Sequence, residues 1–142
     1  MEYAFWDSSA IVSLCIEQQT TPILQGLISR YRMAVWWSTP VEVHSGFERL
    51  RRTGRITANE HVAALVEAEF FSGGWREITP HDALRDRAER LVERYPLKAA
   101  DALQLAAALS WCNGKPQGRA FIAGDVQLLR AAEDLGFQTI AG

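Results

Sequence analysis

The chain is poor in the residues that build disulfide-linked domains and zinc sites. It has two cysteines, Cys15 and Cys112, with no CxxC spacing, and three histidines with no HExxH spacing. Neither a disulfide framework nor a zinc site is therefore indicated, and we expect the cysteines to be small buried hydrophobic side chains. The scattered histidines, His44, His61 and His81, are expected to face solvent.

The sequence also lacks a long apolar run. The longest, from Ala99 to Trp111, is interrupted by Asp101 and Gln104 and is too short to cross a bilayer. No secretion-signal pattern occurs near the N-terminus. With 142 residues, 48% hydrophobic and 23% charged, the composition predicts one domain over residues 1–142, located in the cytoplasm and without a membrane partner.

A strong excess of charge of either sign is missing as well. The chain has 15 basic and 17 acidic residues, a net charge of −2, which by itself predicts no nucleic-acid partner. However, 13 of the 15 basic residues are Arg, whose forked guanidinium suits phosphate groups. The composition therefore permits RNA binding without predicting it.

Short apolar runs alternate with helical patterns along the whole chain. Strands are expected at residues 3–6, 33–37, 75–78, 120–123 and 137–140, and helices at 10–16, 22–32, 41–52, 57–73, 79–96, 98–111 and 126–135, with a polar loop at 17–21. Strands separated by helices favour parallel pairing through right-handed crossovers. The expected fold is α/β, a three-layer α/β/α sandwich with a mainly parallel central sheet.

Four carboxylates, Asp7, Glu42, Asp101 and Asp125, lie where expected strands end or helices begin. In a parallel sheet the carboxyl ends of the strands share one edge, so acids far apart in sequence can meet there. Four acids at one edge would repel one another unless a cation neutralised them. Oxygen ligands without His or Cys suit Mg²⁺ or Mn²⁺, whose usual work in proteins is on phosphate esters.

Each acid also has a local explanation, because a carboxylate at a helix N-terminus accepts free backbone N–H groups. Residues 39–42 form a capping-box pattern in which Glu42 would bond back to the cap, and Asp125 would serve as an N-cap. The same box pattern occurs at residues 57–60 and 79–82. Asp101 lies on a helix that is apolar on nearly every side, where a buried acid needs a cation or another partner, such as Lys98.

The segments around the four acids resemble a known set of motifs. They are a strand ending in D-S-S-A at residues 3–10, a Glu-led helix at 39–43 that continues into Arg-rich sequence at 49–55, a D-A-x-x-L-A helix at 97–106, and an acid segment at 121–125 followed by a closing strand. In this order they resemble the PIN-domain family, and within it the VapC-type toxins of bacterial toxin–antitoxin pairs. One departure is Ala123, where many relatives have Thr or Ser.

The resemblance implies a divalent-metal-dependent endoribonuclease in which Asp7, Glu42, Asp101 and Asp125 hold one or two Mg²⁺ or Mn²⁺ ions. No motif encodes the RNA target or the cleavage site. The resemblance also implies a cognate antitoxin protein and a homodimer. The alternative function is a catalytically silent PIN-like module that binds RNA or a protein partner and keeps the acids as helix caps.

Three other features have two interpretations each. An apolar stripe is expected either to contact a partner or to join the core; it consists of Val62, Leu65, Val66 and Phe70. A group of arginines is expected either to bind RNA phosphates or to form a solvated helix face; it consists of Arg49, Arg51, Arg52 and Arg55. Trp36 and Trp37 are consecutive in an expected strand, which predicts one ring on each face of the sheet.

Overall fold

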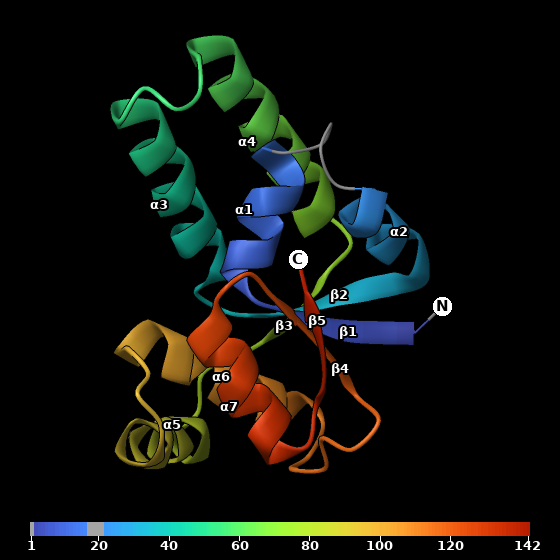
Figure 1. Ribbon diagram of the computed structural model, residues 1–142, viewed down its shortest axis with the longest axis vertical. Coiled ribbons are helices and arrows are strands. Elements are labelled where there is room, and N and C mark those ends of the chain that lie inside the picture. The colour runs from blue at the N-terminus through green and yellow to red at the C-terminus, as the bar shows by residue number, and fades with distance from the viewer. Residues whose placement is uncertain (1, 17–21) are drawn as a thin grey trace.

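The computed structural model describes residues 2–16 and 22–142, which form one five-stranded sheet with helices on both faces (Figure 1). Every strand pair in this sheet is parallel. The predicted three-layer α/β/α sandwich is therefore confirmed. The loop expected at residues 17–21 lies outside the described residues.

The strands are β1 (Glu2–Trp6), β2 (Tyr31–Trp36), β3 (Arg76–Ile78), β4 (Ala120–Ala123) and β5 (Gln138–Ala141). The helices are α1 (Ser8–Ile16), α2 (Pro22–Arg30), α3 (Thr39–Arg52), α4 (Ala58–Ser72), α5 (Asp82–Arg94), α6 (Ala99–Trp111) and α7 (Val126–Leu135). The elements expected at residues 120–123 and 126–135 have these bounds in the structure. The others are present with their ends shifted by a few residues.

Two shifts have clear physical reasons. Helix α2 ends at Arg30 because Tyr31 already pairs with Glu2 in the parallel ladder between β2 and β1. Helix α5 begins at Asp82, where the ring of His81 caps the helix by accepting a hydrogen bond from the backbone N–H of Leu84 at 3.2 Å. The capping box predicted at residues 79–82 was therefore wrong.

The strand order is β3-β2-β1-β4-β5. The chain therefore adds β2 and β3 on one side of β1 and then β4 and β5 on the other side. Between β1 and β4 the direction of winding reverses, and the two strands pair through Trp6 and Ile122. The backbone N–H of Asp7 extends this contact by bonding to the carbonyl of Ile122 at 2.9 Å. Crevices at such reversal points, beyond the carboxyl ends of the strands, are the usual ligand sites of open α/β sheets.

Each strand contributes side chains alternately to two apolar cores. In β1, Ala4 and Trp6 pack in the core beneath α1 to α4, whereas Phe5 packs in the core beneath α5 to α7. All three are completely buried. This two-sided burial explains why the strands read as short continuous apolar runs rather than as alternating patterns.

Trp36 and Trp37 do not divide between the two faces, so that prediction was wrong. Trp36 is 5% exposed and belongs to the core beneath α5 to α7. Trp37 is 55% exposed, because β2 ends at Trp36 and the chain then turns toward α3. The two rings touch edge to face with centroids 6.5 Å apart.

The apolar stripe of α4 is not part of the core. Val62, Val66 and Phe70 are 57%, 64% and 78% exposed, and Leu65 is half-buried. The buried residue of this helix is Ala64. Of the two interpretations of the stripe, the structure thus excludes the core for three of its four side chains.

Among residues 2–16 and 22–142, no helix has both the length and the apolar content that spanning a bilayer requires.

A close approach between α1 and α3 depends on Gly46. A Cβ atom at this position would lie 2.9 Å from Cγ2 of Val12, which is too close for two carbons. Val is stiff in a helix because its branched Cβ restricts χ1, so it cannot easily turn away. The glycine therefore lets α3 pack tightly against α1.

We predict that Gly46→Ala destabilises the protein, and that the same change stabilises it when Val12 is already Ala. Overpacking costs roughly 1–3 kcal/mol, which exceeds the gain of about 1 kcal/mol that Ala has over Gly in a helix. Without the Val12 methyl groups only the helix gain remains. Urea unfolding of the four proteins in this double-mutant cycle measures both effects. An effect of equal size and sign in the two backgrounds would show that the close contact is unimportant.

Candidate functional site

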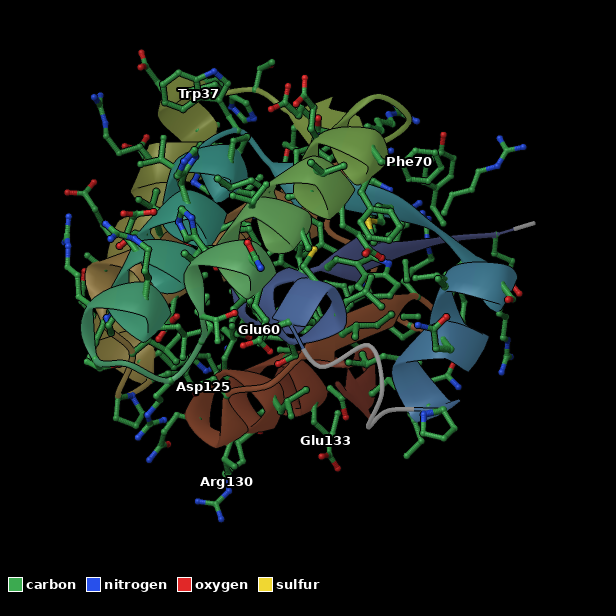
Figure 2. The ribbon with its side chains drawn as sticks, turned by 90° about the horizontal axis from the view of Figure 1, so that it is seen from above. Trp37, Glu60, Phe70, Asp125, Arg130 and Glu133 are labelled. Carbon is green, nitrogen blue, oxygen red and sulfur yellow. The ribbon has the colours of Figure 1, made fainter. Side chains whose placement is uncertain are left out.

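The four predicted acids line one cleft of about 740 Å³ beyond the carboxyl ends of β1 and β4. Asp7 follows β1, Glu42 lies in the first turn of α3, Asp101 in the first turn of α6, and Asp125 directly before α7. Figure 2 shows Arg130 and Glu133, on the helix that follows Asp125, pointing outward from the protein. The fold thus brings acids from four separate segments to one cavity.

Asp7 is the most deeply placed of the acids, with only 2% of its surface exposed. Its Oδ2 accepts hydrogen bonds from the backbone N–H of Ser9, at 3.0 Å, and from the Ser9 hydroxyl. Its Oδ1 is buried without any hydrogen-bond partner among the described residues. A buried carboxylate oxygen without a donor is costly unless a cation or a proton satisfies it.

Burial raises the pKa of Asp7 from its ordinary 3.8 to about 6, and the negative charges of Asp101 and Glu42 act in the same direction. The two hydrogen bonds from Ser9 oppose this shift but do not cancel it. The carboxylate is thus held in a place that disfavours its charge. Carboxylates with pKa values shifted in this way cluster at functional sites.

Ser9 also ties the two central strands together at the cleft. Its hydroxyl accepts a hydrogen bond from the backbone N–H of Gly124, at 2.9 Å, in the turn between β4 and α7. In the sequence, Ser9 belongs to the D-S-S-A segment that follows the first strand. The contact between residues so far apart in the chain could not be seen in the local pattern.

Glu42 is held by side chains from three elements rather than by a helix cap. Its Oε1 accepts from the Ser8 hydroxyl at 2.9 Å and from Nε2 of Gln104 at 3.1 Å, and its Oε2 accepts from the Ser38 hydroxyl at 2.5 Å. Helix α3 begins at Thr39 with Ser38 as its N-cap residue. The capping-box interpretation of Glu42 is therefore wrong.

The control pattern at residues 57–60 behaves differently. There the Thr57 hydroxyl accepts from the Glu60 backbone N–H at 3.1 Å, and the Glu60 carboxylate accepts from the Thr57 backbone N–H at 2.9 Å. This is a complete capping box, as predicted. Glu42 has a similar sequence context but a different set of partners.

Gln104 was missed as a member of the site. Its side chain is completely buried, and besides Glu42 its Nε2 also contacts the Thr39 hydroxyl at 3.2 Å. Its Oε1 has no partner among the described residues. The available signal was a polar residue inside an apolar helix, three positions after Asp101, since a buried amide must have a partner.

Asp101 is half-buried, and burial raises its pKa, with further contributions from the negative charges of Asp125 and Glu42. Lys98 opposes this shift. Within the described residues, however, Lys98 forms no ion pair with Asp101 closer than 4 Å. Lys98 therefore acts on Asp101 through its charge at longer range and not through a direct ion pair.

Asp125 is an N-cap, as its local pattern indicated. Its Oδ1 accepts a hydrogen bond from the backbone N–H of Leu128 at 2.9 Å. The cap uses this one oxygen, and the residue still lines the cleft with the other acids. Capping and a place in the site are thus compatible here.

The four acids share a cavity without meeting at a single point. In residues 2–16 and 22–142, no three His, Cys, Asp or Glu side chains are close enough together to hold one metal ion. The donor chemistry nevertheless suits a hard cation, because all four groups are carboxylates and Asp7 has a buried oxygen without a donor. Three basic side chains line the same cleft, Arg49, Arg55 and Lys98.

Comparisons with known proteins identify the fold. No known protein family matches the sequence, and no curated protein matches it either. Among solved structures, the crystal structure of PAE2754 from Pyrobaculum aerophilum is similar, with a TM-score of 0.65 and 16% sequence identity over 99% of this chain and 89% of that one. At this identity the likeness shows the three-layer α/β/α fold alone.

We predict that the metal-free protein loses stability as the pH rises from 5 to 7.5, and that Asp7→Asn removes most of this loss. Since the folded-state pKa of Asp7, about 6, is above its ordinary 3.8, the folded protein binds more protons than the unfolded chain between these values. The total effect is roughly 3 kcal/mol, of which roughly 1 to 1.5 kcal/mol falls between pH 5 and 7.5. Urea unfolding at the two pH values measures it.

The matched control is Glu133→Gln, an exposed acid on α7 that does not line the cleft. It should keep the pH dependence of the natural protein. If Asp7→Asn and the natural protein lose the same stability over this range, Asp7 does not carry a raised pKa.

Proposed function

We propose that this protein is a Mg²⁺- or Mn²⁺-dependent endoribonuclease, the toxin component of a toxin–antitoxin system. The observation that carries the proposal is the shared cleft of Asp7, Glu42, Asp101 and Asp125, with a buried Asp7 oxygen that lacks a hydrogen-bond donor. Carboxylates from four segments gather at the reversal point of a parallel sheet, where their negative charges repel one another. A divalent cation bound there would neutralise this repulsion.

The electrostatics of the cleft support a cation. The carboxylates of Asp7 and Asp101 are both destabilised by burial and by neighbouring acids, so each gains from a positive charge nearby. A bound divalent ion would supply a hydroxide at neutral pH and would offset the charge that builds on a phosphodiester during hydrolysis. The acids of this chain would bind and orient the ion.

The contacts of Glu42 support a rigid ligand rather than a mobile surface acid. Ser8, Ser38 and Gln104 fix both of its oxygens from α1, from the turn before α3 and from α6. A carboxylate held from three sides keeps its position when the charge in the cleft changes. Such support around a metal ligand commonly sets its orientation.

The basic side chains of the cleft support a polyanionic substrate. Arg49 and Arg55 are exposed, line the same cavity as the acids, and form no ion pair within the described part of the chain. Arg51, by contrast, is paired with Glu48 at 2.8 Å. Guanidiniums without a carboxylate partner can bind the phosphates on either side of a scissile bond. The choice of RNA rests on the motif resemblance.

A second candidate is a catalytically silent PIN-like module that binds RNA or a protein partner. Two observations favour it: Asp125 has a complete capping role, and no three acids among the described residues converge on one point. In this module the cleft would bind its partner through the basic side chains, and the acids would need no metal.

We predict that the purified protein cleaves a mixed pool of structured RNA in Mg²⁺ or Mn²⁺, and that EDTA or Asp101→Asn abolishes cleavage. Asp101→Asn removes one charge from the cleft without changing side-chain size, so the fold should persist. Gel analysis of RNA fragments measures activity, and calorimetry with Mn²⁺ measures metal binding, which we expect to weaken at least tenfold in the variant.

Glu133→Gln is the control here too, because it removes one negative charge from an exposed position outside the cleft. It should retain both cleavage and Mn²⁺ affinity. A folded natural protein that neither cleaves RNA nor binds Mn²⁺ would contradict the ribonuclease proposal and favour the silent module.

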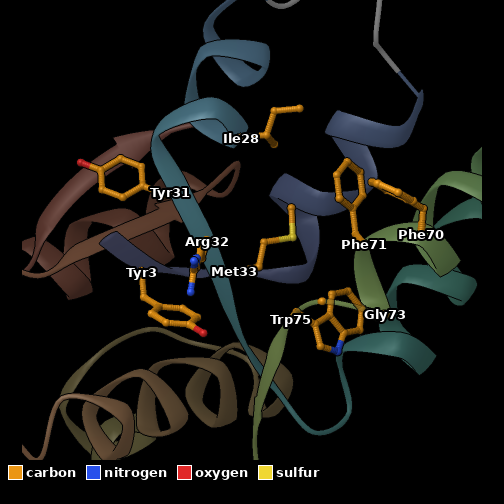
Figure 3. A pocket seen from close by; sticks show the side chains of 10 residues that line it. Tyr3, Ile28, Tyr31, Arg32, Met33, Phe70, Phe71, Gly73 and Trp75 are labelled. Atoms are coloured by element: carbon orange, nitrogen blue, oxygen red, sulfur yellow. The ribbon is translucent and has the colours of Figure 1, made fainter. Parts of the chain in front are cut away.

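The proposal includes a second copy of the chain and an antitoxin as partners, and the apolar stripe of α4 is a surface suited to such contacts. Its exposed side chains Val62, Val66 and Phe70 recur at every fourth position of one helix. Beside Phe70 lies a cavity of about 510 Å³, lined largely by apolar side chains from β1, β2, α2 and α4 and from the turn after α4 (Figure 3). Contiguous exposed apolar surface of this kind commonly marks a protein interface.

We predict that Val66→Asp keeps the fold and shifts the protein from dimer to monomer. The side chain is 64% exposed, so a charge costs little in the monomer but is buried in an interface. Light scattering gives the mass, and circular dichroism reports the fold. The control is Val92→Asp, a 43% exposed apolar position on α5 that should leave the mass unchanged. Equal masses for the natural protein and Val66→Asp would remove α4 from the dimer interface.

A further inference from the structure

We propose that a pocket between α5 and the C-terminal end of α6 binds a phosphate group. The pocket has a volume of about 250 Å³ and is lined by residues of both helices and of the turn that follows α6. Its polar lining residues are His81, Arg87, Arg90, Ser110 and Asn113. None of its lining residues belongs to the acidic cleft.

The charge of this pocket is positive and unbalanced. Arg87 and Arg90 are three residues apart, on one face of α5, and no Asp or Glu lines the pocket with them. Neither guanidinium forms a hydrogen bond or ion pair within residues 2–16 and 22–142. The same helix does pair Arg85 with Asp82 at 3.5 Å and Arg94 with Asp134 at 3.2 Å. The two pocket arginines are thus the ones left available for an external anion.

His81 and Ser110 add a neutral donor. The Nδ1 of His81 accepts from the Leu84 backbone N–H at 3.2 Å, so the ring proton is on Nε2. Nε2 lies 3.1 Å from the Ser110 hydroxyl and therefore donates to it. The Ser110 hydroxyl, having accepted that bond, keeps its own hydrogen, which has no acceptor among the described residues.

The pocket therefore offers donors and no charged acceptor. Two guanidiniums carry fixed forks of N–H groups, and the Ser110 hydroxyl can donate one more hydrogen bond. The oxygens of a phosphate accept several such bonds at once, and forked guanidinium contacts to phosphate are among the strongest hydrogen bonds in proteins. A carboxylate has only two oxygens and less charge, so it would satisfy fewer of these donors.

The size of the pocket limits the ligand. A volume of 250 Å³ is below the roughly 300 Å³ at which pockets for drug-sized molecules begin. Inorganic phosphate or the phosphate end of a nucleotide fits this scale. Ser110 also follows Asp101 by nine positions in α6, about 14 Å along the helix axis, so the pocket is separate from the cleft. The inference does not depend on the ribonuclease proposal.

The test is an NMR titration of the metal-free, ¹⁵N-labelled protein with inorganic phosphate at low ionic strength and neutral pH. We expect saturable shifts of the Asn113 and Gly114 backbone amides and of the Nε–H signals of Arg87 and Arg90. Each single change, Arg87→Gln or Arg90→Gln, should weaken binding about tenfold, and Ser110→Ala a few-fold. The control Arg85→Gln, on the same helix but outside the pocket and paired with Asp82, should bind like the natural protein.

Several results would overturn the proposal. One is a folded protein whose pocket signals do not shift with phosphate; another is chloride or acetate producing the same shifts at the same concentrations. A third is unchanged phosphate affinity in both Arg87→Gln and Arg90→Gln. Further titrations with AMP and with a dinucleotide, with and without a 5′-phosphate, identify the source. Tighter binding of AMP indicates a free nucleotide, and tighter binding of the 5′-phosphorylated dinucleotide than of AMP indicates an RNA end.

Discussion

The structure depends on the parallel pairing of β1 with β4 at the centre of the sheet. This pairing joins Trp6 to Ile122 and continues through the Asp7 backbone N–H. It places the turn after one strand beside the turn after the other, and Ser9 locks the two turns through Gly124. Both cores pack on these strands, so the acidic cleft is a direct product of the topology rather than an addition to it.

Some acids of the cleft are held firmly by hydrogen bonds, whereas burial disfavours the negative charge of others. Glu42 has hydrogen bonds on both oxygens, and Asp125 caps a helix, so these acids have structural contacts that compensate their burial. Asp7 has hydrogen bonds on one oxygen only, Asp101 accepts none among the described residues, and burial raises the pKa of both. An arrangement that gives up stability in this way is usual where a protein must receive a charged ligand.

The sequence allowed the layers and most element boundaries to be predicted, because apolar runs and helix start signals are local. The strand at residues 120–123 and the helix at 126–135 are examples. The segments carrying the four acids could also be found from local pattern. What could not be predicted is which distant side chains hold them: Ser8 and Gln104 reach Glu42 across 34 and 62 positions of the chain. The exposure of Trp37 was missed, and the α4 stripe could not be assigned to the surface or the core, since burial depends on how elements pack and not on hydropathy alone.

The order of the elements has a consequence for protein synthesis. Strand β1, which Asp7 follows directly, precedes the other described elements in the chain, whereas its neighbour β4 comes after all of them except α7 and β5. Until then Asp7 has no β4 beside it, and neither Ile122 nor Gly124 is present to fix its turn. The central site therefore cannot form before β4 and the turn after it have been made. Any activity that it supports begins only after β4 has been made, and products that end before β4 lack it entirely.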